Sequence, residues 1–173
     1  MKKLLMVLIV GCMVASVVYF SGCVEEKVEE EVPELSLGET AIIYGISFTV
    51  DRYEFTDSYV TEHNKTVYPA DGAKFLWIYV KAQNKGEIAR EIPSRDWRGM
   101  QLLYKGSEIH PCFDHEIPPM GGRMYPKYGE EIYPDVTREG WVLFEVPINI
   151  NMSQARLHVE RYYGEEATWN LGS

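Results

Sequence analysis

Cysteine is scarce in this chain: there are only three among 173 residues, Cys12, Cys23 and Cys112. Cys12 lies in an apolar N-terminal run and Cys23 directly follows that run, so a domain that begins after them keeps one thiol. No disulfide can form within such a domain, which excludes the disulfide-stapled class of small exported proteins. Its hydrophobic core must hold it together, and the stretch from residue 35 to 173 is long enough to build one.

Positive charge is also in short supply. Lysine and arginine number 17 against 26 acidic residues, which gives the whole chain a net charge of −9. Six glutamates and one lysine crowd into residues 24–34, and without this segment and the two N-terminal lysines the remaining domain carries about −6. A surface of this sign repels the phosphate backbone of nucleic acids, so we exclude nucleic acid as a partner.

No stretch of ten or more residues shows the 3.6-residue apolar period of a helix. Apolar and polar residues instead alternate in short runs between turn residues, which predicts an all-β domain built as an antiparallel β-sandwich. The run 75–83, FLWIYVKAQ, is apolar almost throughout, as expected of a central strand buried on both faces. The other predicted strands are 37–43, 46–50, 100–104, 107–109, 141–146 and 155–160.

The N-terminus has the layout of an export signal. Two lysines precede an apolar run from Leu4 to Phe20, and Ser21-Gly22-Cys23 follows it. This order predicts a lipoprotein signal peptide over residues 1–22, cleaved before Cys23, with lipid attached to the Cys23 sulfur. The alternative is a retained N-terminal anchor helix, although 17 residues span only ~26 Å against a bilayer core of about 30 Å. Either reading places the domain on the outer face of the cell membrane.

Residues 23–34 would then form a short acidic tether that ends at the membrane. Their sequence after Cys23, VEEKVEEEVPE, has too little apolar content to fold by itself. Charge repulsion should extend it to about 35–40 Å at most. We therefore divide the chain into a signal (1–22), a lipidated cysteine with its tether (23–34) and one domain (35–173).

Four segments of the domain, in this order, carry a family resemblance. They are LGETAIIYGISFTVDRYE (37–54), GAKFLWIYVKAQNKG (72–86), MQLLYKGSEIHP (100–111) and EGWVLFEVP (139–147). Together they resemble a family of uncharacterised lipoprotein domains from archaea and Gram-positive bacteria, with an immunoglobulin-like β-sandwich similar to that of a mycobacterial secreted immunoprotective antigen. The family has no established activity, so the resemblance implies an immunoglobulin-like fold and an envelope location only.

The segment 111–139 has no clear strand pattern and is longer than the corresponding family loop. It contains five prolines, three tyrosines and two methionines. Long irregular connections are uncommon in compact domains unless they are functional, and tyrosine with glycine and proline builds rigid binding loops. The alternative is that the segment covers one edge of the sandwich. If it binds a ligand, aromatic and arginine side chains should dominate the contact; these are Phe113, Arg123, Tyr125, Tyr128 and Tyr133.

The start of this segment also contains candidate metal ligands. Cys112, His115 and Met120 have the spacing of a blue-copper loop, and His63 could supply a second imidazole. Zinc would instead use His110, Cys112, His115 and Glu116, which crowds four ligands into seven residues. At least two predicted strands follow Cys112, unlike in cupredoxins. We therefore expect no cofactor, with copper or zinc as the alternative, and a partly buried Cys112 in a surface loop.

Catalytic motifs are missing. His115-Glu116 is followed by Ile-Pro-Pro, so it cannot be the helical His-Glu-x-x-His zinc motif, and the chain has no Gly-x-Ser-x-Gly elbow. Asp114 and Glu116 could pair for acid–base chemistry, but neighbouring acids in a loop are usually only solvated. We therefore expect a protein that is not an enzyme.

Two further features have alternative readings. Asn64 and Asn151 each begin a glycosylation sequon, which matters only in an exported protein whose host glycosylates asparagine. Trp97 is expected to pack at the start of a strand, with an exposed binding anchor as the alternative.

These observations lead to one expected function and two alternatives. We expect a membrane-anchored extracytoplasmic binding module, whose partner is a protein, a cell-surface polymer or a small solute. The first alternative is a copper- or zinc-binding envelope protein that uses the 110–120 loop. The second is a structural spacer of the envelope.

Overall fold

The computed structural model describes residues 34–112, 116–160 and 164–172, all of which belong to one compact unit, Val32–Ser173. The expectations for the signal peptide, for Cys23 and for nearly all of the tether concern residues outside this described part, as do those for Phe113 and His115.

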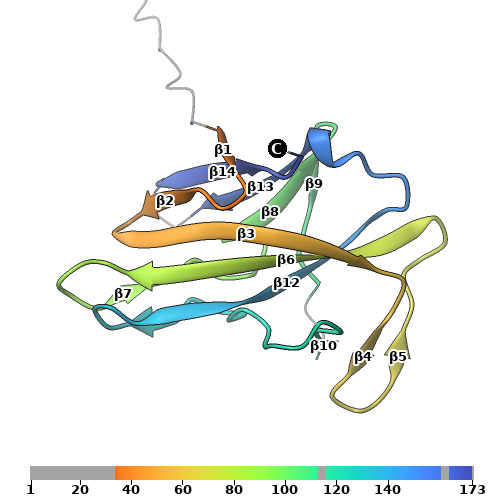
Figure 1. Ribbon diagram of the computed structural model, residues 1–173, viewed down its shortest axis with the longest axis horizontal. Helices are drawn as coiled ribbons and strands as arrows, with labels where there is room; N and C mark the ends of the chain where they lie inside the picture. Colours follow the sequence, from red (N-terminus) through yellow and green to blue (C-terminus); the bar gives the residue numbers. More distant parts are fainter. Residues whose placement is uncertain (1–33, 113–115, 161–163, 173) are drawn as a thin grey trace, which may run out of the picture. The chain divides into compact units, whose positions relative to one another are not determined.

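Two sheets form the body of the domain (Figure 1). The first contains β1 (Glu34–Ser36), β14 (Glu166–Asn170), β13 (Ala155–Glu160), β8 (Met100–Tyr104) and β9 (Ser107–Ile109) in spatial order, and the second contains β12 (Thr137–Pro147), β6 (Ala73–Asn84), β3 (Ile46–Thr56) and β2 (Thr40–Ile43). Small sheets join β10 (Glu116–Ile117), β4 (Tyr59–Thr61) and β5 (Thr66–Val67), and β11 (Glu131–Ile132) with β7 (Arg90–Glu91). A 3₁₀ turn, η2, spans Met152–Gln154.

The predicted all-β sandwich is confirmed. The described strands pair antiparallel, except that β1 lies parallel to β14. Side chains from both main sheets share one core, in which the rings of Phe48 on β3 and Trp169 on β14 lie 5.6 Å apart. The seven predicted strands are all present, whereas β1, β4, β5, β7, β10, β11 and β14 were not predicted from the sequence.

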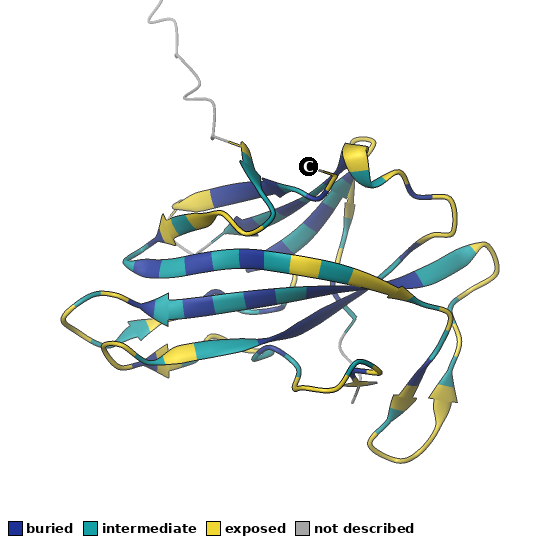
Figure 2. Ribbon diagram, viewed as in Figure 1, coloured by how far each residue is buried: buried dark blue, intermediate teal, exposed yellow. Residues whose placement is uncertain are grey.

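β6 is the central strand of its sheet, as predicted, because it pairs with β12 on one side and β3 on the other. Successive side chains of a strand point to opposite faces. Leu76, Ile78 and Val80 therefore enter the main core, while Phe75 and Trp77 enter a second core on the outer face of the sheet. Residues 75–78 of β6 are all buried, and buried and intermediate residues alternate over the remainder of the strand, residues 79–84 (Figure 2).

The segment after β9 covers the second core and the edge of β12. Cys112 N donates a hydrogen bond to Leu143 O at 2.8 Å. Further along, Trp141 N donates to Arg123 O at 3.0 Å and Tyr125 N donates to Trp141 O at 2.9 Å. The edge-covering role considered for the 111–139 segment is therefore present in the structure. It removes an exposed strand edge that could otherwise pair with another chain.

Asn84 fastens the end of β6 to the loops that follow. Its side-chain amide donates to Ile88 O at 2.8 Å and Ile132 O at 2.9 Å, and its side-chain oxygen accepts from Gly86 N at 2.9 Å. The residue is fully buried, so these three bonds replace the water that its amide loses on folding. They hold residues 85–92 against β11 and so set the position of one wall of the groove described below.

No helix among the described residues is long and apolar enough to span a bilayer.

Candidate functional site

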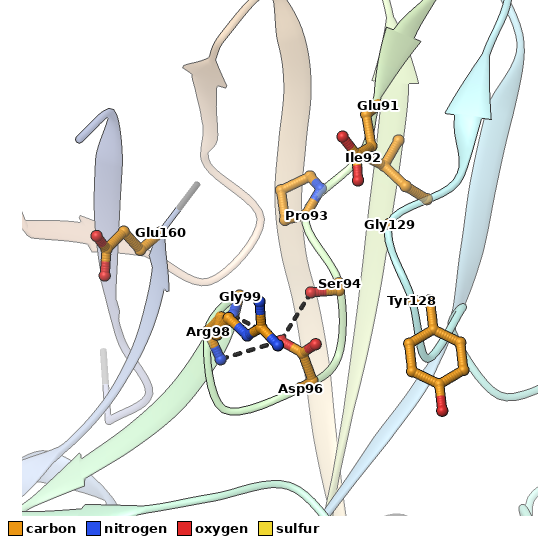
Figure 3. Close-up of a pocket in the computed structure, with 10 residues that line it drawn as sticks. All are labelled: Glu91, Ile92, Pro93, Ser94, Asp96, Arg98, Gly99, Tyr128, Gly129 and Glu160. Atoms are coloured by element: carbon orange, nitrogen blue, oxygen red, sulfur yellow. Dashed lines mark hydrogen bonds between the residues drawn. The ribbon is translucent and has the colours of Figure 1, made fainter. Parts of the chain in front are cut away.

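The connection from β7 to β8 lines a groove of about 370 Å³, which we call the β7–β8 groove (Figure 3). Three parts of the chain contribute to it: the 91–99 segment, the Tyr128-Gly129 turn and the end of β13. Its lining residues are Glu91, Ile92, Pro93, Ser94, Asp96, Arg98, Gly99, Tyr128, Gly129 and Glu160. In the view of Figure 3, Asp96 and Arg98 lie between Glu160 on one side and Tyr128 on the other.

Asp96 organises the first wall of the groove. Its Oδ1 accepts hydrogen bonds from Ser94 Oγ at 2.8 Å, Arg98 N at 3.0 Å and Gly99 N at 3.1 Å. A side chain at residue 99 could not fit, because its Cβ would lie 2.1 Å from Ser94 O. The turn is therefore closed tightly on itself, and the intervening residue, Trp97, is part of it.

Trp97 differs from the other three tryptophans because it is exposed. Trp77, Trp141 and Trp169 are buried, and their indole N–H groups donate to Thr56 Oγ1, Gly121 O and Glu39 O, each at 3.0 Å. Trp97 is instead 56% exposed, so the prediction that it packs at a strand start is wrong and the exposed alternative holds. Gln101 Nε2 donates to Trp97 O at 3.0 Å, and the Arg98 guanidinium lies 5.0 Å from its ring centroid.

The two walls of the groove are joined through their backbones. Arg95 N donates to Pro126 O at 3.2 Å and Ile92 N donates to Glu130 O at 2.9 Å, while β7 pairs with β11 below them. Glu91 packs so closely on Gly129 that a Cβ there would lie 1.9 Å from its Oε1. Tyr128 precedes this glycine in the turn and is 70% exposed.

Acidic groups outnumber basic groups around this groove. Glu91, Asp96 and Glu160 line it with one guanidinium, that of Arg98. A neighbouring hollow shares Glu91 and Gly129 and extends to Tyr44 and Glu131. Another, shallower hollow shares Arg98 and Glu160 with the groove and extends to Trp97.

Of the five residues predicted to bind a ligand, the four that the structure describes do not form one site. Tyr128 lines the groove. Tyr133 is 73% exposed and is not among the lining residues, and Arg123 is exposed. Arg123 contributes to lowering the pKa of Glu130, although the hydrogen bonds from Arg138 are the larger cause. Phe113 lies outside the described residues.

For Tyr125, the predicted direct contact with a ligand has to be corrected. The ring is 1% exposed and packs edge-on against Phe48, 6.1 Å away between centroids. Burial raises the pKa of its hydroxyl well above the ordinary value. Tyr125 is drawn inward because residues 123–125 run along the edge of β12, a long-range pairing with no local sequence signal.

The proposed metal ligands are only partly described. β4 pairs with β10, which brings the β4–β5 hairpin that carries His63 beside residues 116–117. Cys112 is partly buried, as expected, and packs with Met120 against the outer core. Within the described residues, no three His, Cys, Asp or Glu side chains are grouped to hold a metal ion, and His115 lies outside that part.

Both sequon asparagines are exposed. Asn64 sits in the β4–β5 turn with a positive φ of 56°. Asn151 caps η2, where its Oδ1 accepts from Ser153 N at 3.2 Å and from Ser153 Oγ at 2.9 Å.

Comparison with known families finds one match. The family described as a domain of unknown function, DUF4352, matches residues 35–168. No curated protein matches the chain in sequence.

Solved structures similar to this domain share the β-sandwich. The yjhA protein from Bacillus subtilis is 16% identical with a TM-score of 0.58, over 79% of this chain and 98% of that one. A candidate lipoprotein, ycdA, from the same organism is 15% identical with a TM-score of 0.51, over 79% of this chain and 38% of that one. A β-sandwich protein from Clostridium difficile is 14% identical with a TM-score of 0.51, over 83% and 97%.

Proposed function

This chain belongs to the DUF4352 family, whose model matches 35–168, and from that premise we propose that it is a membrane-anchored lipoprotein on the outer face of the cell that binds a ligand without transforming it. The N-terminal signal pattern that ends at Cys23 supports the anchor. The similar fold of ycdA, itself a candidate lipoprotein, agrees with it.

The observation that carries the binding role is the rigid display of Trp97. A large apolar side chain is normally buried, as the other three tryptophans are. Here the hydrogen bonds to Asp96 Oδ1 close the turn that carries Trp97, and its side chain is exposed in a hollow that shares Arg98 and Glu160 with the polar groove. Exposed aromatic residues fixed in position make strong binding contacts, because little side-chain entropy remains to be lost.

The binding role can be tested with the soluble chain 24–173, since the compact unit 32–173 contains both described cores. We expect it to sediment with isolated cell envelopes of the organism that makes it. Trp97→Ala and Tyr128→Ala should each weaken this association about tenfold or more, while Tyr133→Ala, equally exposed, should not. Envelope association that is equal in all four proteins would refute a binding role for the groove.

The anchor is tested separately in living cells. Cys23→Ser should abolish incorporation of labelled fatty acid and leave the precursor unprocessed, because the serine hydroxyl cannot replace the thiol as lipid acceptor. Undiminished labelling of the Cys23→Ser protein would refute lipidation at this residue.

The proposal involves neither catalysis nor a cofactor. Metal analysis of the purified chain tests the copper or zinc alternative. One observation favours that alternative: β4 pairs with β10, which lies within the 110–120 segment. Stoichiometric metal that is lost in Cys112→Ser would establish that alternative.

A further inference from the structure

We infer that the β7–β8 groove binds a glycan strand whose sugar rings carry no negative charge. The inference rests on the proposed function, because it names the chemical class of the ligand for the same groove. It follows from three properties of the lining residues: the aromatic rings at its rim, the polar groups within it and the balance of charge.

The aromatic rings suit the apolar faces of sugars. A pyranose ring has C–H faces and a rim of hydroxyls, so it can stack on an aromatic ring while its edge remains hydrated or hydrogen-bonded. Tyr128 lines the groove and is 70% exposed, and Trp97, which is 56% exposed, lies between Asp96 and Arg98 and lines the adjoining hollow. Two such platforms on a rigid frame can hold sugar rings with little loss of side-chain entropy.

The polar lining suits hydroxyl groups. Carboxylates of Glu91 and Glu160 accept hydrogen bonds, and the Arg98 guanidinium donates them. A hydroxyl both donates and accepts, so a polyol can satisfy both kinds of group in one site. A purely apolar ligand would remove water from these charged groups without replacing the lost hydrogen bonds, which is unfavourable.

The charge balance excludes acidic polymers. Three carboxylates and one guanidinium line the groove, and the extension toward Tyr44 adds Glu131 as well as Arg90. Arg90 is stacked on the Tyr44 ring at 4.7 Å, as Arg98 is on Trp97 at 5.0 Å. Phosphate or uronate groups placed here would face an excess of negative charge, whereas neutral or amine-bearing sugars would not.

The length of the depression favours a strand over a single sugar. The three hollows share lining residues, so they form one path from Tyr44 past Tyr128 to Trp97. Aromatic rings at successive points along one path suit successive rings of a polymer.

Titration calorimetry of the soluble chain 24–173 with three hexamers tests this assignment. The N-acetylglucosamine and glucosamine hexamers should bind, and the galacturonic acid hexamer should bind at least tenfold more weakly. Trp97→Ala should weaken hexamer binding tenfold or more with an unchanged melting temperature, and Tyr133→Ala should leave it unchanged. In the double variant Glu91→Gln/Glu160→Gln, the difference in affinity between the uncharged hexamer and the uronate hexamer should become smaller.

Each other outcome overturns the glycan assignment. The assignment is refuted if the uronate hexamer binds as tightly as the uncharged one, and it is also refuted if none of the hexamers binds. If hexalysine binds instead and Trp97→Ala abolishes it, the ligand is a basic peptide. The proposed function is judged independently, because envelope association that depends on Trp97 would stand even where all three hexamers fail.

Discussion

Replacing Tyr125 by phenylalanine should stabilise this domain, although the substitution only removes an atom from its core. The Tyr125 ring is fully enclosed between the sheets, and its hydroxyl is buried without a hydrogen-bond partner among the described residues. The change keeps the ring and its edge-on contact with Phe48 and removes only the polar oxygen.

The expected size follows from desolvation. A buried hydroxyl without a partner costs roughly 1–3 kcal/mol relative to water, and removing the oxygen leaves a very small void that offsets part of this. We therefore expect a gain of about 1 kcal/mol in the free energy of unfolding, or about 3 °C in melting temperature. Tyr125→Ala should instead lose about 3–5 kcal/mol, because it empties the ring site.

Urea unfolding at neutral and alkaline pH measures both effects. Burial raises the pKa of Tyr125 well above its ordinary value of 10.0, so the folded state keeps the neutral phenol. The resulting stability is fully present below pH 10 and is lost as the pH rises toward the raised folded-state pKa. The advantage of Tyr125→Phe over the wild type should therefore grow above pH 10.

A loss of 1 kcal/mol or more in Tyr125→Phe at neutral pH would refute this reasoning. It would mean that the hydroxyl makes a hydrogen bond in solution, for example to a buried water. An advantage that does not change between pH 8 and pH 11 would refute the assignment of the raised pKa.

Three further predictions concern the covered edge, the β6 terminus and an ion pair. Gly140→Ala should destabilise the domain by about 1–3 kcal/mol in urea unfolding, because its Cβ would lie 2.5 Å from Tyr125 N and push residues 123–125 off β12; urea unfolding identical to that of the wild type would contradict this. Asn84→Ala should lower the free energy of unfolding by about 2–4 kcal/mol, since it leaves the carbonyls of Ile88 and Ile132 without their donor. It should also increase hydrogen exchange at the Gly86 amide, which loses its acceptor, and equal exchange in the two proteins would contradict this. Arg138→Gln should raise the pKa of Glu130 toward its ordinary value of 4.5 in an NMR titration, because hydrogen bonds from Arg138 lower that pKa. The stability that this pair contributes is present above pH 4.5 and is lost as the pH falls through the lowered pKa. A variant that is less stable than the wild type by the same amount at pH 7 and at pH 2 would therefore exclude the effect.

The sequence predicted the elements whose signals are local. Alternation over 46–50 and 155–160 marks β3 and β13, and the apolar run 75–83 marks β6, because the side chains of a strand point to opposite faces regardless of what lies across them. The expectation of an export signal ending at Cys23 likewise rests on consecutive residues. The excess of acidic charge, from which we expect no nucleic-acid partner, is likewise read directly from the sequence.

The tertiary structure alone decided which residues of the irregular segments reach solvent. Tyr125 and Tyr128 are three residues apart and equally suited by type to a binding loop, yet one is 1% and the other 70% exposed. The difference arises because residues 123–125 pair with the distant edge of β12, while the turn after them pairs with the β7 segment. Likewise, the sequence predicts that Trp97 packs at a strand start, whereas in the structure it lies in the closed turn around Asp96 and is 56% exposed. Strands follow from short-range periodicity, whereas burial in a loop depends on contacts between residues far apart in the chain, which no local pattern encodes.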